Sequence, residues 1–194
     1  MEHKNIEIVF LARGGQGAKT ASLILANAYL KAGYFVQAFS EYGPERSGAP
    51  VKSYLRISEN RIQLHSQIEN PDYLIVLDDT LLEKGETIDY LNQKLKIIIN
   101  TSKDFQELIS KFLYLRKYSV FIFNANNLSK KILGKPYINF AMAGYISSFI
   151  NLKTNEIIIN ARKEIQNHFP GELGIKNANV FEQSANKSQG FLKL

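Results

Sequence analysis

Residues 6–33 read IEIVFLARGGQGAKTASLILANAYLKAG and contain the three parts of one structural unit. Residues 6–12 form a short apolar run, and the glycine turn RGGQG follows directly at residues 13–17. Over residues 18–32 small side chains recur on one face of a helix, which lets such a helix sit close to a sheet. Gly33 stands where a helix C-cap glycine belongs. Strand, glycine turn and helix are the opening unit of a parallel α/β sheet.

The rest of the chain continues this pattern. Further strands are expected at residues 36–42, 72–77, 96–100 and 120–123, and further helices at residues 139–152 and 154–168. Residues 51–58 and 61–65 alternate around a turn, which predicts a β-hairpin. The polar, Asn-rich residues 175–194 are expected to form an irregular tail. We therefore expect one α/β domain over residues 1–194, with a Rossmann-like, open, mostly parallel sheet flanked by helices and a β-hairpin inserted after strand two.

Composition limits the classes of function. The 194 residues include no cysteine, which excludes disulfides and an iron–sulfur cluster or Cys-based zinc site held by this chain. The N-terminus lacks the pattern of a secretory signal, and no apolar run approaches the length of a membrane span. A cytoplasmic protein without a membrane partner is the expectation.

The net charge of +6 arises from 24 basic and 18 acidic side chains. Basic residues are scattered, and the densest group is the short Lys130-Lys131 pair with Lys135. A solvated basic surface is therefore favoured over a nucleic-acid partner.

The glycine turn admits three interpretations, each using backbone amides exposed at a helix N-terminus or the tight geometry that glycine allows. As a dinucleotide fingerprint, GQG at residues 15–17 fits, with Glu41 as a ribose ligand, but Thr20 stands where a third glycine or alanine is expected. As a P-loop it fails, because Arg13 and Ala18 occupy positions that must be glycine. The third interpretation is a structural turn that packs the helix on the sheet.

Residues 42–50 (YGPERSGAP) carry two glycines and two prolines and predict an ordered loop at the carboxyl end of the second strand. Ligands and partners of open α/β sheets bind at that edge, beside the glycine turn. A simple surface ion pair between Glu45 and Arg46 is the alternative. The constrained loop with its aromatic and charged groups favours a contact surface.

Other patterns offer no catalytic or metal site. The histidines His3, His65 and His168 lie far apart, and no pair has the spacing of metal ligands on a helix. Asp78-Asp79, at a strand end, could bind a metal, but a helix N-cap is the simpler interpretation, with Thr80 as a further N-cap candidate. We expect neither catalytic residues nor a metal site in this chain.

Four motifs together carry a family resemblance. They are RGGQG at 13–17, YGPERSG at 42–48, PDYLIVLD at 71–78 and NFAMAG at 139–144. In this order and spacing the chain resembles the gamma subunit of 2-oxoacid:ferredoxin oxidoreductases, with pyruvate:ferredoxin oxidoreductase (pyruvate synthase) as the nearest member. The resemblance covers almost the whole chain. Ser47 and Ala49 stand where many members carry arginine and glycine, so the motif does not select among pyruvate, 2-oxoisovalerate and 2-oxoglutarate.

The resemblance implies a complex that converts a 2-oxoacid and coenzyme A into acyl-CoA and CO2 while reducing ferredoxin. It implies thiamine diphosphate and Mg²⁺ in alpha and beta chains, [4Fe-4S] clusters in delta-type and beta chains, and no cofactor in this chain. The gamma chain is expected to pack on the catalytic chains and to help shape the approach for coenzyme A. A stand-alone dinucleotide-binding oxidoreductase domain is the alternative.

The expected contact surface combines the glycine turn with the loop that follows strand two. Its candidates are Arg13, Gly14, Gly15, Gln16, Gly17, Tyr42, Gly43, Glu45, Arg46, Ser47 and Gly48. Lys19, Lys52 and Arg56 are expected to add to a positive field there. Arg13 of the glycine turn and Arg46 of the loop would pair with carboxylates or phosphates, which suit the planar guanidinium group.

Overall fold

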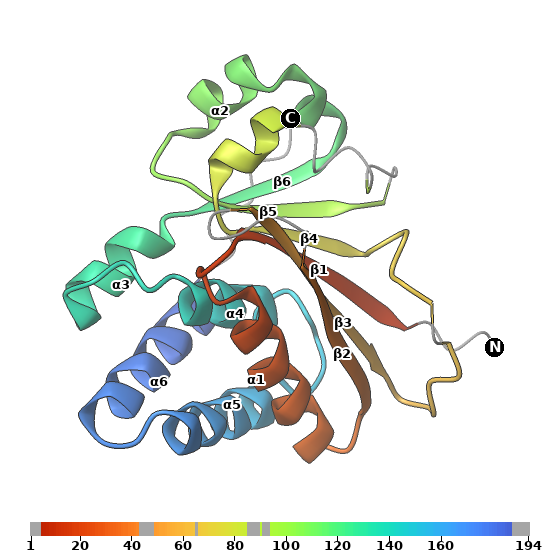
Figure 1. Ribbon diagram of the computed structural model, residues 1–194, viewed down its shortest axis with the longest axis vertical. Coiled ribbons are helices and arrows are strands. Elements are labelled where there is room, and N and C mark those ends of the chain that lie inside the picture. Colours follow the sequence, from red (N-terminus) through yellow and green to blue (C-terminus); the bar gives the residue numbers. More distant parts are fainter. Residues whose placement is uncertain (1–4, 43–48, 65, 85–89, 91–93, 188–194) are drawn as a thin grey trace.

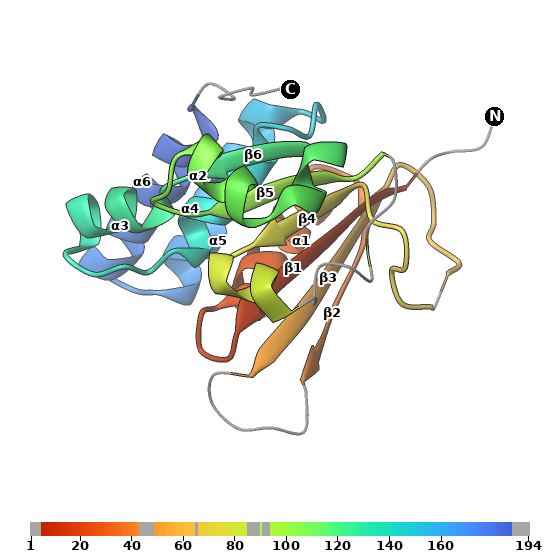
Figure 2. The same cartoon turned by 90° about the horizontal axis from the view of Figure 1, so that it is seen from above.

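The computed structural model describes residues 5–42, 49–64, 66–84, 90 and 94–187. Its centre is a six-stranded mixed sheet in the order β2-β3-β1-β4-β5-β6, which Figure 2 shows from one edge to the other. The strands are β1 (Ile6–Arg13), β2 (Phe35–Tyr42), β3 (Pro50–Ser58), β4 (Tyr73–Val76), β5 (Lys96–Asn100) and β6 (Ser119–Phe123). Strands β1, β4, β5 and β6 run parallel, whereas β3 is antiparallel to both β1 and β2.

Helices cover both faces of this sheet (Figure 1). One face packs on α1 (Ala18–Lys31), α3 (Ala125–Leu133), α4 (Asn139–Ser147), α5 (Thr154–His168) and α6 (Glu172–Ala185). The other face is covered by α2 (Phe105–Lys111) and by the 3₁₀ helices η1 (Asp79–Lys84) and η3 (Leu113–Lys117). The expected α/β fold with a helix-flanked sheet is thus confirmed. No helix of the described residues is long and apolar enough to span a membrane.

The predicted hairpin is wrong in its pairing. Strand β3 pairs with β2 on one side and with β1 on the other, and residues 61–64 form no strand; His65 lies outside the described residues. The reason is burial: Leu55 and Ile57 point into one core and Tyr54 into the other. A strand buried on both faces is stable in the middle of a sheet, where both of its edges are hydrogen-bonded.

The tail prediction is also wrong, because α6 occupies residues 172–185; residues 188–194 lie outside the described part. Small residues let α6 approach its neighbours closely. A Cβ at position 144 in α4 would lie 2.1 Å from the carbonyl oxygen of Phe181, so glycine is required there. Helix α5 has its predicted bounds, α4 ends earlier than predicted, and α2 and α3 were not foreseen.

Arg56 lies inside the sheet layer and not at the carboxyl edge, where it was expected to add positive charge. Its side chain is 2% exposed and lies between its two register partners, Glu7 on β1 and Gln37 on β2. Arg56 Nε donates to Glu7 Oε1 over 2.6 Å, and Nη1 donates to Gln37 Oε1 over 2.8 Å. Its charge is therefore paired with Glu7, and its hydrogen bonds join β3 to both β1 and β2.

We predict that Glu7→Gln lowers the free energy of unfolding by about 3 kcal/mol, because the buried Arg56 guanidinium then lacks a compensating charge. Denaturant unfolding of the isolated chain measures this. The control is Glu83→Gln, at the ion pair with Lys111 whose side chains are 50% and 51% exposed. That change should cost less than about 1 kcal/mol. Equal losses for both variants would contradict the role of the buried pair.

Candidate functional site

The carboxyl ends of β1 and β4 meet at the point where the chain divides between the two faces of the sheet. After β1 the chain enters α1 on one face, and after β4 it enters η1 on the other. In open α/β folds such a switch point is the usual ligand crevice. Here four polar side chains bridge it: Arg13 and Gln16 from the glycine turn, and Asp78 and Thr80 from the β4 end.

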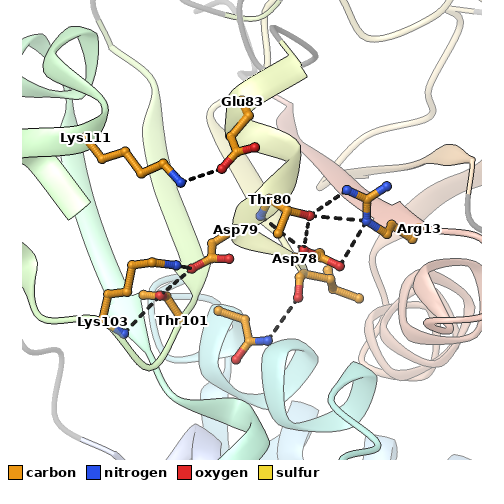
Figure 3. Close-up of polar contacts among 10 residues, drawn as sticks. Arg13, Asp78, Asp79, Thr80, Glu83, Thr101, Lys103 and Lys111 are labelled. Atoms are coloured by element: carbon orange, nitrogen blue, oxygen red, sulfur yellow. Dashed lines mark hydrogen bonds and ion pairs between the residues drawn. The ribbon is translucent and has the colours of Figure 1, made fainter. Parts of the chain in front are cut away.

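Asp78 is the centre of this network, and Figure 3 shows its contacts with Arg13 and Thr80. Its Oδ2 accepts hydrogen bonds from Arg13 Nε over 3.2 Å and from Gln16 Nε2 over 3.0 Å. Its Oδ1 accepts from the amide and the hydroxyl of Thr80 over 3.1 and 2.5 Å. Arg13 Nη2 also donates to the Thr80 hydroxyl over 2.5 Å. The Arg13–Asp78–Gln16–Thr80 group is called the clasp below.

These bonds keep the Asp78 carboxylate ionised. Partial burial raises its pKa, but hydrogen bonds from Thr80 and Gln16 and the positive charge of Arg13 outweigh burial and leave the pKa below its ordinary value. Asp78 also accepts the Thr80 amide at the start of η1. The N-cap interpretation of Asp78 is thus confirmed, whereas Thr80 is not the capping residue.

Asp79 forms a second ion pair beside the clasp (Figure 3). Its Oδ2 accepts from Thr101 Oγ1 over 2.7 Å and from Lys103 Nζ over 2.5 Å. The hydrogen bond to Asp79 raises the pKa of Lys103. Within the described ranges, no group of three or more His, Cys, Asp or Glu residues could hold a metal ion.

The glycine turn has the backbone geometry that only glycine adopts without strain. Gly15 and Gly17 have φ angles of 91° and 80°. Gln16 closes the turn, because its Oε1 accepts from the Arg13 amide over 2.8 Å. Gly17 also lies against α4: a Cβ there would be 2.8 Å from Asn139 Nδ2. The turn therefore joins the start of α1 to the start of α4.

Two hollows flank the turn. The larger, of about 600 Å³, is mainly apolar and is lined by Gly15, Gln16, Gly17, Asn126, Pro136, Tyr137, Ile138, Asn139, Phe140, Phe169, Leu173 and Asn177. The smaller, of about 260 Å³, is polar and lies among the residues that follow β4 and β5. Both hollows share Gln16, Asn126 and Ile138.

The structure brings together only part of the expected contact surface. Residues 13–17 form the turn, but Gly43, Glu45, Arg46, Ser47 and Gly48 lie outside the described residues. Tyr42 ends β2, which is separated from β1 by β3 and is not its neighbour. The loop still returns to the turn, because the amide of Gly14 donates to the carbonyl oxygen of Ala49 over 2.8 Å.

Lys19 and Lys52, which were expected to add positive charge near the turn, lie on different elements, α1 and β3. Lys19 is exposed on the first turn of α1, and Lys52 Nζ lies 5.1 Å from the ring centroid of Tyr90. Sequence reasoning missed the partnership of Asp78 with Arg13 and the part played by Asn177 in the larger hollow. Position 78 follows a buried strand, which was a usable signal; Asn177 had been placed in an irregular tail.

The fold and this edge define a class: an α/β domain with an antiparallel strand inserted into a parallel sheet and a switch point closed by its own side chains. The family model of pyruvate ferredoxin/flavodoxin oxidoreductase matches residues 7–186. The chain belongs to this family.

Individual relatives are similar to this chain over nearly its whole length. The chain is 40% identical to pyruvate synthase subunit PorC of Methanocaldococcus jannaschii, over 94% of this chain and 96% of that protein. It is 39% identical to the pyruvate/ketoisovalerate oxidoreductases common subunit gamma of Thermococcus kodakarensis, over 94% and 97%. The crystal structure of pyruvate oxidoreductase subunit PORC from Thermotoga maritima superposes with a TM-score of 0.79 at 30% identity, covering 95% of this chain and 97% of that one. The resemblance found in the motifs is thereby confirmed.

The turn geometry predicts unequal costs for two alanine substitutions. Gly15→Ala should lower the free energy of unfolding by about 1 kcal/mol. No atom lies within 4 Å of the new Cβ, so only the positive φ is strained. Gly17→Ala should cost at least about 2 kcal/mol, because the clash with Asn139 adds to that strain. Thermal or denaturant unfolding of the isolated chain gives both values.

Adding Asn139→Ala to Gly17→Ala should recover part of the loss, because the nearest clashing atoms are removed. If both single variants unfold like the wild type, the turn is not conformationally demanding.

Asp78→Asn should destabilise the chain at neutral pH, and the difference from wild type should shrink in acid. The folded-state pKa lies below the ordinary value of 3.8, so the ionised carboxylate stabilises the fold above that value. This contribution is lost as the pH falls through the folded-state pKa, that is, below about pH 4. Unfolding curves at several pH values test it; a difference that stays constant down to about pH 2 would contradict the prediction.

Proposed function

We propose that the chain is the gamma subunit of a multisubunit 2-oxoacid:ferredoxin oxidoreductase of the cytoplasm, with pyruvate as its 2-oxoacid. The complex performs coenzyme A-dependent oxidative decarboxylation to acyl-CoA and CO2 and reduces ferredoxin. The identity of 40% and 39% to proteins named as subunits, over nearly the full length of both partners, is the observation that carries the proposal.

Within the complex this chain is proposed to be non-catalytic. The acidic side chains at the carboxyl edge are used internally, Asp78 by Arg13 and Asp79 by Lys103. General acid–base chemistry needs a titratable group within hydrogen-bond reach of a substrate. Following the family resemblance, thiamine diphosphate, Mg²⁺ and [4Fe-4S] clusters are assigned to alpha, beta and delta-type subunits. For the clusters, the lack of cysteine in this chain supports that assignment.

The alternative, a stand-alone dinucleotide-binding domain, is disfavoured by two features of the edge. Arg13, Gln16, Asp78 and Thr80 bond to one another across the carboxyl ends of β1 and β4, where the pyrophosphate of a dinucleotide would lie. Glu41, the ribose-ligand candidate, stands on β2, two strands away from β1, and its Oε2 accepts from Tyr54 over 2.7 Å. A ribose bound near the glycine turn is therefore out of reach of this carboxylate.

The glycine turn and the loop over residues 42–48 are proposed to face the thiamine-diphosphate chains, near the path of coenzyme A. Support comes from the bond between Gly14 and Ala49, which places the end of this loop at the turn. The Arg13 guanidinium is held by Asp78 and Thr80, so its part is to fix the turn. Arg46 remains the candidate for contact with a phosphate or a partner carboxylate.

The isolated chain is expected to be colourless and inactive, and a complex reconstituted without it should lose coenzyme A-dependent ferredoxin reduction. In the complete complex, Arg46→Ala should raise the apparent KM for coenzyme A or weaken subunit association, with the KM for the 2-oxoacid nearly unchanged. Absorption spectra, metal analysis and steady-state kinetics measure these quantities.

Arg116→Ala, at an exposed position on η3, is the matched control and should behave like the wild type. A stoichiometric cluster or flavin in the isolated chain, or intrinsic reductase activity, would refute the subunit assignment. An Arg46→Ala complex indistinguishable from wild type would refute only the placement of the loop.

A further inference from the structure

We infer that the larger hollow and the lysines at its rim form a docking surface for an acidic segment of another subunit, which inserts an apolar side chain beside the glycine turn. The surface is defined by Lys130, Lys135, Tyr137, Leu173 and Asn177. The inference rests on the proposed function, because it requires a partner subunit. It concerns a different part of the chain from the loop at residues 42–48.

The lysines give this surface its positive charge. Lys130 lies one helical turn after Asn126, which lines the hollow, and Lys135 directly precedes Pro136, which also lines it. Both lysines are exposed, and neither is paired with a carboxylate in the part of the chain that the structure describes. The described carboxylates Asp78, Asp79 and Glu83 are in ion pairs with other residues, so an acidic partner would complement the positive charge at this rim.

Two helix N-termini strengthen the preference for a negative group. The N-cap residues of α1 and α4 are Gly17 and Ile138, whose side chains have no group that could accept a hydrogen bond from the helix amides. Both of these residues line the hollow. The partial positive charge at helix N-termini favours an anion between them, such as an aspartate or glutamate carboxylate.

Asn177 provides an independent sign of a missing partner. Its residue is 3% exposed and lines the hollow, and its Nδ2 donates to the carbonyl oxygen of Leu173 over 2.9 Å. Its Oδ1 is buried and accepts no hydrogen bond from the residues that the structure describes. A buried acceptor without a donor costs free energy. If docking turns the amide so that Oδ1 faces the hollow, a backbone N–H of the segment can donate to it in exchange for the bond from Nδ2 to Leu173.

The rim favours a protein segment as the occupant. Tyr137 and Leu173 are 49% and 48% exposed, although both are large apolar side chains beside an apolar hollow. An apolar centre with exposed aromatic and aliphatic anchors, surrounded by charges, is typical of subunit interfaces. An acidic segment with one apolar residue matches every part of this surface: carboxylates for the lysines and helix ends, an amide for Asn177, and an apolar group for the hollow.

The test uses two pairs of matched variants in the reconstituted complex. Lys130→Glu/Lys135→Glu is compared with Arg116→Glu/Lys117→Glu, which changes the net charge equally at exposed positions on η3, over the opposite face. Tyr137→Ser is compared with Leu113→Ser, whose side chain is 60% exposed on η3. The dissociation constant of each chain from the remaining subunits is measured at low and high salt, together with the KM for coenzyme A.

Only the variants of the docking surface should weaken association, by at least about tenfold at low salt for the lysine pair, with a smaller salt dependence than wild type. Lys130→Gln/Lys135→Gln should show an intermediate loss, which guards against misfolding of the charge-reversed chain. In the wild-type complex, a carbodiimide should couple Lys130 or Lys135 to an acidic residue of a partner subunit, as identified by mass spectrometry.

Association equal to that of the controls would overturn this inference. A raised KM for coenzyme A with unchanged association would also overturn it, since the hollow would then receive the coenzyme. Failure of the wild-type chain to join the complex would instead refute the proposed function.

Discussion

The carboxylate of Asp78 joins the two chain segments that leave the carboxyl ends of β1 and β4. Its partners Arg13 and Gln16 are 65 and 62 residues away in sequence, so the contact connects the first strand to the middle of the sheet. Gln16 in turn accepts the Arg13 amide and thereby fixes the glycine turn. Arg13, Gln16 and Thr80 all donate to the ionised carboxylate of Asp78, so one half-buried charge holds the edge together.

This closure changes what the glycine turn can do. In a dinucleotide-binding fold the crevice at the switch point is open, and the pyrophosphate lies over the helix N-terminus. Here the same strand, turn and helix are present, but Arg13 and Gln16 are bonded to Asp78 across the carboxyl ends of β1 and β4. Insertion of β3 between β1 and β2 also moves Glu41 one strand further away. The accessible space beside the turn is divided between the small polar hollow that follows β4 and β5 and the larger hollow on the α4 and α6 side.

The sequence predicts best what depends on neighbouring residues. The strand and helix around the turn, and both ends of α5, follow from local periodicity and helix-ending signals. The partners of β3 do not, because alternation identifies a strand without naming what it pairs with. Arg56 shows the same limit, since an arginine in a strand indicates an exposed position until Glu7 and Gln37 are seen beside it. Helix α6 was missed because its Asn-rich composition concealed the spacing of small residues that pack against α4.

Charged groups at the carboxyl edge and at the rim of the larger hollow are distributed differently. Acidic groups at the carboxyl edge are matched within the chain: Asp78 with Arg13, Asp79 with Lys103, and Glu83 with Lys111. A group neutralised in this way fixes structure but has little capacity left to transfer a proton to a substrate. The lysines at the rim of the larger hollow have no such acidic match among the described residues, so part of the net charge of +6 faces outward there. Two features of this edge suit association with an acidic partner. The ion pairs at the switch point keep the surface rigid, which lowers the entropy lost on binding. The lysines beside it supply positive charge that attracts and orients an acidic surface.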